Sequence, residues 1–285
     1  MAIFFDTHAH LDAPDFASDI AAVVTRAEAA GIARIISIGT DLESSRRAIH
    51  LAENIPCVYA AVGWHPNYCA NAPDDVISPL RELALHPKVV AIGETGLDYH
   101  RLPGRQMEDP MKEAIGIEGV QDPQEIRRNL ADGECMDRQK AVFRAQLDLA
   151  EELGLSVIIH QREAFEDCHA IMKEYRGRVR GVWHCFVDSP ALATRVLDMG
   201  GLVSFTGIVT FKNAAAVRET AATVPLDRML IETDCPFLAP EPGRGKRCEP
   251  AHVARVAEKI ALLKDLDADE VARVTTSTAR GFFKW

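Results

Sequence analysis

The stretch Ile3-Phe4-Phe5-Asp6-Thr7-His8-Ala9-His10 places an apolar run directly before two histidines. Apolar runs of this length, separated by helical patterns, are typical of buried strands in a parallel sheet. In a closed (β/α) barrel the C-terminal ends of all strands point to one face, and that face carries the active site. Four more such runs each precede a side chain that can bind a metal: residues 89–93 precede Glu94, 155–159 precede His160, 180–183 precede His184 and 229–233 precede Asp234.

Strand and helix patterns alternate through most of the chain. Eight strand-plus-helix units in this order favour an α/β fold with a closed (β/α)8 barrel over an open doubly wound sheet. About 250 residues are typical of such a barrel, so the 285 residues fit a single domain spanning 1–285. Further strands are expected at 33–38, 57–62 and 201–205, and helices at 16–30, 41–53, 79–85, 138–153, 162–175, 190–199, 214–222, 249–263 and 268–279.

The composition limits the compartment and the partners. No apolar run approaches the roughly 18 residues of a membrane span, so no membrane contact is expected. Asp6, His8 and His10 in the first strand argue against a signal peptide. Seven cysteines without a C-x-x-C pair favour reduced thiols and a cytoplasmic location. Because the net charge is −10, an anionic substrate has to be held by metal ions and a few local cations, not by a basic face.

The six candidate ligands combine imidazoles with carboxylates. His8 and His10 are two residues apart, so a strand directs both side chains to the same side. Each candidate alone has an ordinary interpretation, such as a solvated turn, a salt-bridged carboxylate, a core histidine or a helix cap. Taken together, these ordinary interpretations would require several independent strands to place a possible ligand at the same height in the barrel by chance. A shared metal site is therefore favoured.

The number of ligands bears on the number of ions. Nitrogen and oxygen donors suit zinc, manganese, magnesium or a similar divalent ion. Six ligands exceed the three of a single open zinc site, so two divalent metal ions are expected, with Glu94 as the candidate bridge. Two ions a few ångströms apart are an arrangement that suits hydrolysis.

Five motifs carry a resemblance to a known family. They are Asp6-Thr7-His8-Ala9-His10-Leu11-Asp12, Gly63-Trp64-His65-Pro66, Gly93-Glu94-Thr95-Gly96-Leu97-Asp98-Tyr99, His184-Cys185-Phe186 and Glu232-Thr233-Asp234-Cys235-Pro236. In this order they resemble the signature segments of the TatD metal-dependent hydrolases, which belong to the amidohydrolase-like barrels. The resemblance covers the chain except a long insertion after the fourth strand, at about residues 102–137. It implies a distorted (β/α)8 TIM barrel with a two-metal site.

The resemblance also implies roles for individual residues. Asp234 would orient or deprotonate the attacking water, and His65 would contact the scissile group, as would Arg162. The catalytic candidates are therefore Asp234, Glu94 and His65. The ligands implied are His8, His10, Glu94 and Asp234 for one ion, and Glu94, His160 and His184 for the other.

Three features depart from the family pattern without removing a ligand. They are the insertion, Val187-Asp188 in place of Ser-Gly, and Cys248 where many members have Asn. Beyond the eighth strand, residues 243–247 form a small basic cluster that is either a phosphate grip or a solvated loop. The cations of this cluster are Arg244, Lys246 and Arg247. His100, after the fourth strand, is a further possible substrate contact.

The function implied by the resemblance is a deoxyribonuclease, a phosphodiesterase that removes nucleotides from the ends of single-stranded DNA. The alternative is an ester or amide hydrolase, such as a D-aminoacyl-tRNA deacylase or a small-molecule amidohydrolase. Both reactions need the same metal chemistry, so the ligands alone do not separate them. A metal-binding scaffold without catalysis is a third class, which the complete ligand set disfavours.

The insertion at 102–137 is expected on the catalytic face because it follows a strand end. Between 105 and 137 it holds nine acidic and four basic residues. Asp122 and Pro123 resemble the cap and first position of a helix within it. Its apolar residues suggest that part of it is packed, namely Met107, Met111, Ile115, Ile117, Val120, Ile126 and Leu130. Two interpretations stand: a lid that repels duplex DNA, or an outward decoration or oligomer contact.

Overall fold

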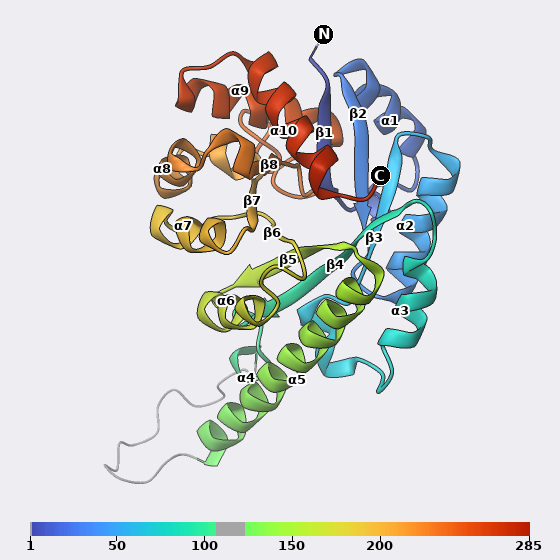
Figure 1. The fold of residues 1–285 in the computed structure, drawn as a ribbon, viewed down its shortest axis with the longest axis vertical. Coiled ribbons are helices and arrows are strands. Elements are labelled where there is room, and N and C mark those ends of the chain that lie inside the picture. Colours follow the sequence, from blue (N-terminus) through green and yellow to red (C-terminus); the bar gives the residue numbers. More distant parts are fainter. Residues whose placement is uncertain (1, 107–122) are drawn as a thin grey trace.

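Eight parallel strands form one sheet in which each strand pairs with the next along the chain (Figure 1). The computed structural model describes residues 2–106 and 123–285. The predicted α/β barrel of alternating strands and helices is confirmed. The strands are β1 (Phe4–Ala9), β2 (Ile32–Ile38), β3 (Val58–Val62), β4 (Val89–Asp98), β5 (Ser156–Arg162), β6 (Gly181–Trp183), β7 (Leu202–Phe205) and β8 (Met229–Ile231).

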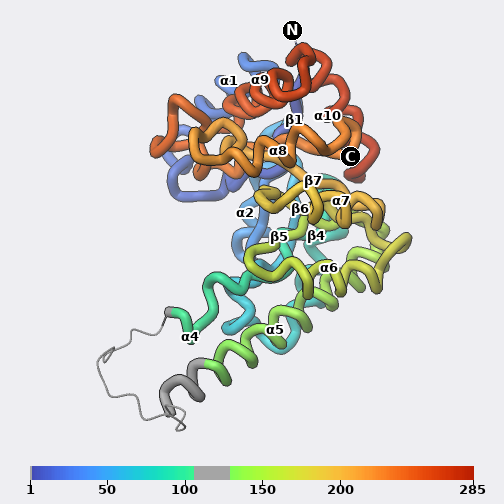
Figure 2. The backbone as a smooth tube through the Cα atoms, turned by 90° about the vertical axis from the view of Figure 1, so that its left-hand side faces the viewer, coloured from blue at the N-terminus to red at the C-terminus, as the bar shows by residue number. Residues whose placement is uncertain are grey.

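Helices surround the sheet on its outer side (Figures 1 and 2). Within the described ranges, no helix combines the length and hydrophobicity needed to cross a membrane. The α-helices are α1 (Ile20–Ala29), α2 (Leu42–Asn54), α3 (Ile77–Ala84), α4 (Pro103–Gln106), α5 (Pro123–Leu153), α6 (Phe165–Glu174), α7 (Pro190–Asp198), α8 (Ala215–Thr223), α9 (Val253–Lys264) and α10 (Ala268–Phe282), and the 3-10 turns are η1 (Pro14–Phe16), η2 (Pro66–Asn71), η3 (Gly207–Thr210), η4 (Leu226–Arg228) and η5 (Pro250–His252).

The barrel closes between β8 and β1 through a few backbone contacts. Asp234 N–H donates to the His8 carbonyl at 2.9 Å, and His10 N–H donates to the Cys235 carbonyl at 2.8 Å. One level below, the buried Asp6 carboxylate accepts hydrogen bonds from the Thr233 backbone N–H at 2.9 Å and its hydroxyl at 2.6 Å. The segments that carry three of the candidate ligands are therefore the segments that close the barrel.

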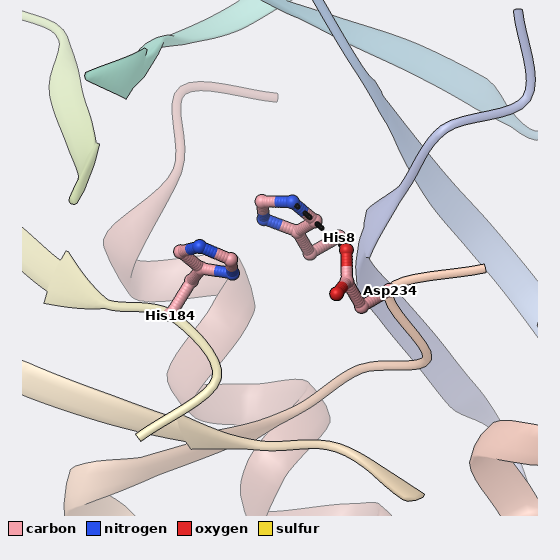
Figure 3. Close-up of side chains that lie close together, drawn as sticks. All are labelled: His8, His184 and Asp234. Carbon is pink, nitrogen blue, oxygen red and sulfur yellow. Dashed lines mark ion pairs between the residues drawn. The ribbon is translucent and has the colours of Figure 1, made fainter. Parts of the chain in front are cut away.

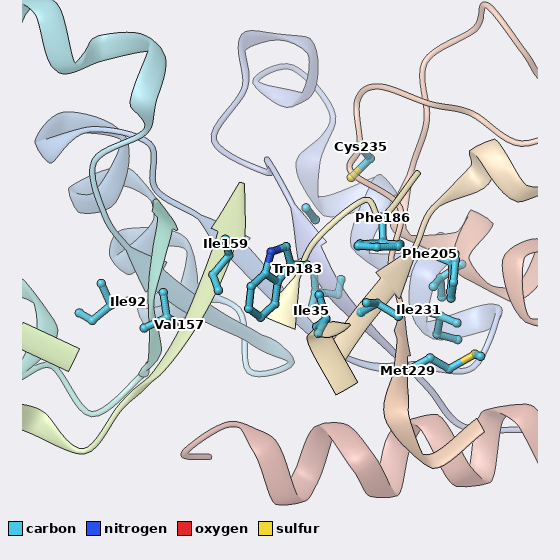
Figure 4. Packing of buried hydrophobic residues seen from close by; sticks show 14 of the residues in the cluster. Ile35, Ile92, Val157, Ile159, Trp183, Phe186, Phe205, Met229, Ile231 and Cys235 are labelled. Carbon is cyan, nitrogen blue, oxygen red and sulfur yellow. The ribbon is translucent and has the colours of Figure 1, made fainter. Parts of the chain in front are cut away.

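Buried apolar side chains form two clusters. The smaller one takes a residue from every strand, among them Phe5, Ile36 and Leu230, and therefore fills the barrel interior. The larger one lies between the sheet and the surrounding helices and includes Trp183 and Phe205 (Figure 4). Each fully buried side chain of this size contributes about 1.5–3 kcal/mol, so these two layers hold the strand ends in register.

Some element boundaries differ from those predicted. Helix α1 begins at Ile20 instead of Phe16, because Pro14 opens a 3-10 turn that buries Phe16. Strand β4 continues to Asp98, so Glu94 lies within the strand and not at its end. A register shift between Ile92 and Thr95 interrupts its pairing with β5 at this point.

The largest difference concerns the insertion. A helix start at Pro123 is confirmed, but this helix continues without a break to Leu153 and so includes the helix predicted at 138–153 (Figure 2). Residues 107–122 lie outside the described ranges. Leu130, one of the apolar residues from which partial packing of the insertion was predicted, is 61% exposed on α5. The choice between a lid and a decoration stays open.

Gly63 is needed where β3 and β4 approach one another. A Cβ atom at Gly63 would lie 2.6 Å from the carbonyl carbon of Gly93, the residue before Glu94. We predict that Gly63→Ala lowers the free energy of unfolding by about 1–3 kcal/mol, because overpacking displaces backbone. Gly133→Ala is the control, since its Cβ would meet nothing within 4 Å on α5 and Ala favours a helix by about 0.5–1 kcal/mol. Urea unfolding that gives both variants the same stability would contradict this.

Candidate metal centre

Four of the predicted ligands form one group at the mouth of the barrel. His8 Nε2 lies 3.5 Å from Glu94 Oε2 and 3.6 Å from Asp234 Oδ1. His10 Nε2 lies 3.7 Å from the same Glu94 oxygen and 3.3 Å from the same Asp234 oxygen. Two imidazole nitrogens and two carboxylate oxygens therefore face a common point, to which β1, β4 and the segment after β8 each contribute.

A second group surrounds the other oxygen of Glu94. Its Oε1 atom lies 2.7 Å from His160 Nδ1, 2.8 Å from His184 Nε2 and 3.2 Å from His65 Nε2. The His160 and His184 nitrogens are themselves 3.2 Å apart. The rings of His8 and His184 are stacked with centroids 4.1 Å apart, which places the two groups side by side (Figure 3). Glu94 thus presents one oxygen to each group.

The first group has the spacing expected of ligands around a small cation. Metal–ligand bonds of 2.0–2.1 Å in a tetrahedral site put neighbouring ligand atoms about 3.3–3.4 Å apart. The four contacts of His8 and His10 with the carboxylates span 3.3–3.7 Å. The buried His8 Nε2 has no hydrogen-bond partner among the described residues, a cost that a cation would remove. The residues present therefore fit a divalent ion.

Burial and neighbouring charges shift the pKa values across the cluster. Burial would raise the pKa of Glu94, but the imidazoles, His184 first among them, outweigh it and hold that pKa well below its usual range. Burial would lower the pKa of His10, but Asp234 raises it to about 9. A proton held between an imidazole and a carboxylate occupies the place of a cation, so metal binding displaces it.

Two carboxylates lie behind the cluster, near the outer ring nitrogens of two of the histidines. Asp98 Oδ2 lies 3.2 Å from His160 Nε2, and Glu232 Oε1 lies 3.7 Å from His184 Nδ1. The hydrogen bond between Asp98 and the outer nitrogen of His160 fixes the tautomer that leaves the inner nitrogen's lone pair free for a metal. Glu232 is too far from His184 for a hydrogen bond and acts on this ring through its charge. Sequence reasoning missed both roles. The signal was present, since each is an acidic residue placed within a buried strand motif close to a predicted ligand.

Helix α5 braces strand β4, which carries Glu94, and the loop after β3, which carries His65. The buried Gln146 accepts the Trp64 N–H at 2.7 Å and donates to the Trp64 carbonyl at 3.0 Å and the Thr95 hydroxyl at 2.6 Å. Gln139 makes the same pair of bonds to the backbone of Asp98, at 2.9 and 3.0 Å. These side-chain amides satisfy backbone groups that the neighbouring strands leave unpaired. They hold β4 and the His65 loop against the helix.

The residue Asp234 is held in an unusual backbone conformation. Its φ of 58° lies in the left-handed region, which costs a non-glycine residue about 1–3 kcal/mol. Two backbone hydrogen bonds hold this conformation: the Asp234 N–H donates to the His8 carbonyl, and the Phe237 N–H donates to the Asp234 carbonyl. The backbone therefore aims the Asp234 carboxylate at the imidazoles of β1.

The predicted substrate contacts lie in different surroundings. His65 is buried inside the cluster, whereas Arg162, at the end of β5, is exposed. The Arg247 guanidinium pairs with Asp19 at 2.8 Å and Glu249 at 2.8 Å. These carboxylates occupy several of its donors, and a role of Arg247 toward a substrate stays a prediction.

Three other polar residues were singled out around the site. Arg244 lies over the Phe211 ring at 4.5 Å, and Lys246 is exposed. His100 Nδ1 lies 2.5 Å from Glu163 Oε1. The roles of all these residues toward a substrate stay predictions.

The comparisons with known proteins identify the family. The family model described as TatD related DNase matches residues 5–284. The chain belongs to the TatD family of metal-dependent hydrolases. It is 41% identical over 99% of both chains to the uncharacterized metal-dependent hydrolase YabD of Bacillus subtilis.

One further relative has a name that mentions a substrate, and another has a solved structure. The protein named 3'-5' ssDNA/RNA exonuclease TatD in Erwinia tasmaniensis is 32% identical over 98% of this chain and 99% of its own. The crystal structure of the TatD homologue YJJV from Escherichia coli superimposes with a TM-score of 0.80 at 30% identity, covering 98% of this chain and 97% of that one. Both the barrel and metal-dependent hydrolysis are thus family properties of this chain.

The arrangement of Glu94 leads to a prediction about metal content. Glu94→Gln keeps the shape of the side chain but removes its charge from between the two groups. We predict that the purified variant loses at least one of two bound ions and most of its hydrolytic activity, with its melting profile little changed. Glu163→Gln, an exposed carboxylate outside both groups, should keep both ions. Elemental analysis that finds two ions and full turnover in Glu94→Gln would rule out the bridging role.

Proposed function

We propose that this chain is a two-ion phosphodiesterase that removes nucleotides from the ends of single-stranded DNA or RNA. The observation that carries the proposal is Glu94, whose two oxygens face two separate groups of imidazoles. Two ions placed in this way suit the in-line displacement at a phosphodiester. The printed name of the Erwinia relative, which is similar over nearly the whole chain, supports a single-stranded substrate.

The two groups of side chains would hold the ions. His8, His10, Asp234 and one Glu94 oxygen would hold the first, and His160, His184 and the other Glu94 oxygen would hold the second. When bound, a pair of divalent ions supplies positive charge that polarises a phosphodiester and eases the deprotonation of water. The net charge of −10 makes this local positive charge necessary for any anionic substrate.

His65 is suited to donate a hydrogen bond to the substrate. Its Nδ1 accepts the Asn67 N–H at 3.0 Å, and burial lowers its pKa to about 4. A neutral ring whose Nδ1 is an acceptor carries its proton on Nε2. The Nε2–H points toward Glu94 and the mouth, where a phosphate oxygen would be within reach. A protonated Nε2 is a hydrogen-bond donor and not a metal ligand.

Asp234 is suited to orient the attacking water and to accept a proton from it. Burial would raise its pKa, but the imidazoles, His10 first, lower it, so the carboxylate is ionised at pH 7. Its Oδ1 faces His8 and His10. Arg162 at the end of β5, and Arg244 and Lys246 in the loop after β8, are exposed cations that would contact flanking phosphates.

A panel of substrates tests the proposed function. Manganese-loaded protein is incubated with single-stranded DNA, single-stranded RNA, blunt duplex DNA, a D-aminoacyl-tRNA and a simple amide. We expect mononucleotides released stepwise from one end of the single strands, with the duplex cleaved more slowly. Hydrolysis of only the aminoacyl ester or the amide would overturn the phosphodiesterase assignment and support the alternative.

Two variants separate water activation from substrate contact. Asp234→Asn should lower kcat by a factor of about 10²–10⁴, the usual loss for a catalytic base. His65→Ala should lower kcat/KM while leaving the metal content unchanged, since its Nε2 carries a proton. Metal content is measured on the same samples. A His65→Ala protein that loses an ion shows that His65 is a ligand, and our tautomer assignment is then wrong.

A further inference from the structure

Two aromatic side chains stand exposed at the mouth of the barrel. Among the described residues, eight large apolar side chains are exposed, and two of them are aromatic: Phe237, 58% exposed, and Tyr68, 47% exposed. Phe237 follows β8 and Tyr68 follows β3, so both lie on the face that carries the metal centre. Single exposed apolar side chains are common, so it is the position of these two rings beside the metal centre that points to ligand contact.

Phe237 is rigidly presented. Within residues 235–240, Pro236 is buried and accepts the Cys248 N–H at 2.9 Å, while Phe237 is the single exposed residue. The next residue, Leu238, has a left-handed φ of 56°, and its carbonyl packs so closely on Gly207 that a Cβ there would lie 2.1 Å away. The exposure of Phe237 therefore results from an ordered loop backbone. Because the backbone is already ordered, a ligand that stacks on Phe237 has to order only the side-chain rotation of the ring.

Each ring lies beside a different half of the metal centre. Phe237 lies 6.2 Å from the ring of His10, which belongs to the group around Glu94 Oε2. Tyr68 lies 6.0 Å from the ring of His65, which belongs to the group around Glu94 Oε1. A phosphodiester placed across Glu94 would direct the nucleotide on one side toward Phe237 and the nucleotide on the other side toward Tyr68.

We propose that Phe237 and Tyr68 stack the two unpaired bases that flank the scissile phosphate, an inference that rests on the proposed function. Stacking on aromatic side chains contributes about 1–3 kcal/mol per base and does not depend on base identity. It adds affinity without ion pairing, which this chain needs because its net charge is −10. Bases within a duplex are already stacked and paired, so the two rings select single strands and frayed ends.

Strands without terminal bases test the stacking. The kcat/KM is measured for a natural single strand and for the same strand with abasic sites at its last two positions at both ends. We expect wild-type protein to prefer the natural strand by about 5- to 150-fold per base. Phe237→Ala and Tyr68→Ala should each reduce this ratio by most of one such factor, while Phe237→Trp should preserve it. Leu262→Ala, which removes a 78% exposed side chain on α9, is the control that should change neither rate.

A binding measurement keeps this test separate from the proposed function. A strand with terminal 2-aminopurine and a non-hydrolysable phosphonate at its last linkage is titrated with metal-loaded protein. We expect the fluorescence to be quenched by the wild type and the Leu262→Ala variant, and far less by Phe237→Ala. A natural-to-abasic ratio near one in the wild type, or a ratio and quenching unchanged in both alanine variants, overturns the stacking. If the wild type quenches 2-aminopurine but cleaves no strand, the stacking stands and the proposed function fails.

Discussion

A carboxylate buried in the barrel mouth organises this structure. Glu94 is 4% exposed, and an ionised carboxylate out of water is tolerated only when charges or hydrogen bonds compensate it. Here the compensation comes from imidazoles on both sides, three around one oxygen and two near the other. The same imidazoles cannot all be protonated together at such distances, so the arrangement calls for cations as well as protons.

The scaffold positions this cluster with bonds that also hold the fold together. The barrel closes through the Asp234 N–H bond to His8 and the His10 N–H bond to Cys235, so closing the sheet and placing three candidate ligands are one event. On the opposite side, the amides of Gln139 and Gln146 tie β4 and the β3 loop to α5. Stability and function therefore depend on the same contacts, so a substitution that breaks one of these contacts affects both the fold and the site.

Much of the fold was predictable because its signals are local. The apolar runs before His160 and His184, and the Asp41 side chain that caps α2 by accepting the Ser44 N–H, need only short stretches of sequence. The convergence of the six candidate ligands followed from the barrel rule that strand ends share a face. What remained hidden depends on contacts between distant residues. Strand β4 continues beyond Glu94 after a register shift in its pairing with β5. Gly93 and Gly96, which adopt positive φ angles there, mark the irregularity in the sequence, but they do not show that the strand resumes.

The supporting residues were hidden for the same reason. Nothing local in the sequence connects Gln146 with Trp64, or Arg247 with Asp19, because these partners are brought together only by the closed barrel. The apolar character of Leu130 is compatible with burial, yet this side chain is exposed on α5. Helix α5 itself extends beyond the barrel (Figure 2). Polar bracing and surface exposure are tertiary properties, and a pattern of hydrophobicity along the chain does not contain them.

The proposed placement of Glu94 between two ions is most directly tested by anomalous scattering from crystals of the manganese-loaded protein. The proposal predicts two anomalous peaks about 3.5–4 Å apart, one beside each oxygen of Glu94, the separation typical of two-metal hydrolytic sites. The peak near Oε2 should also contact His8, His10 and Asp234, and the peak near Oε1 should contact His160 and His184. A single peak, or two peaks of which Glu94 touches no more than one, would contradict the account.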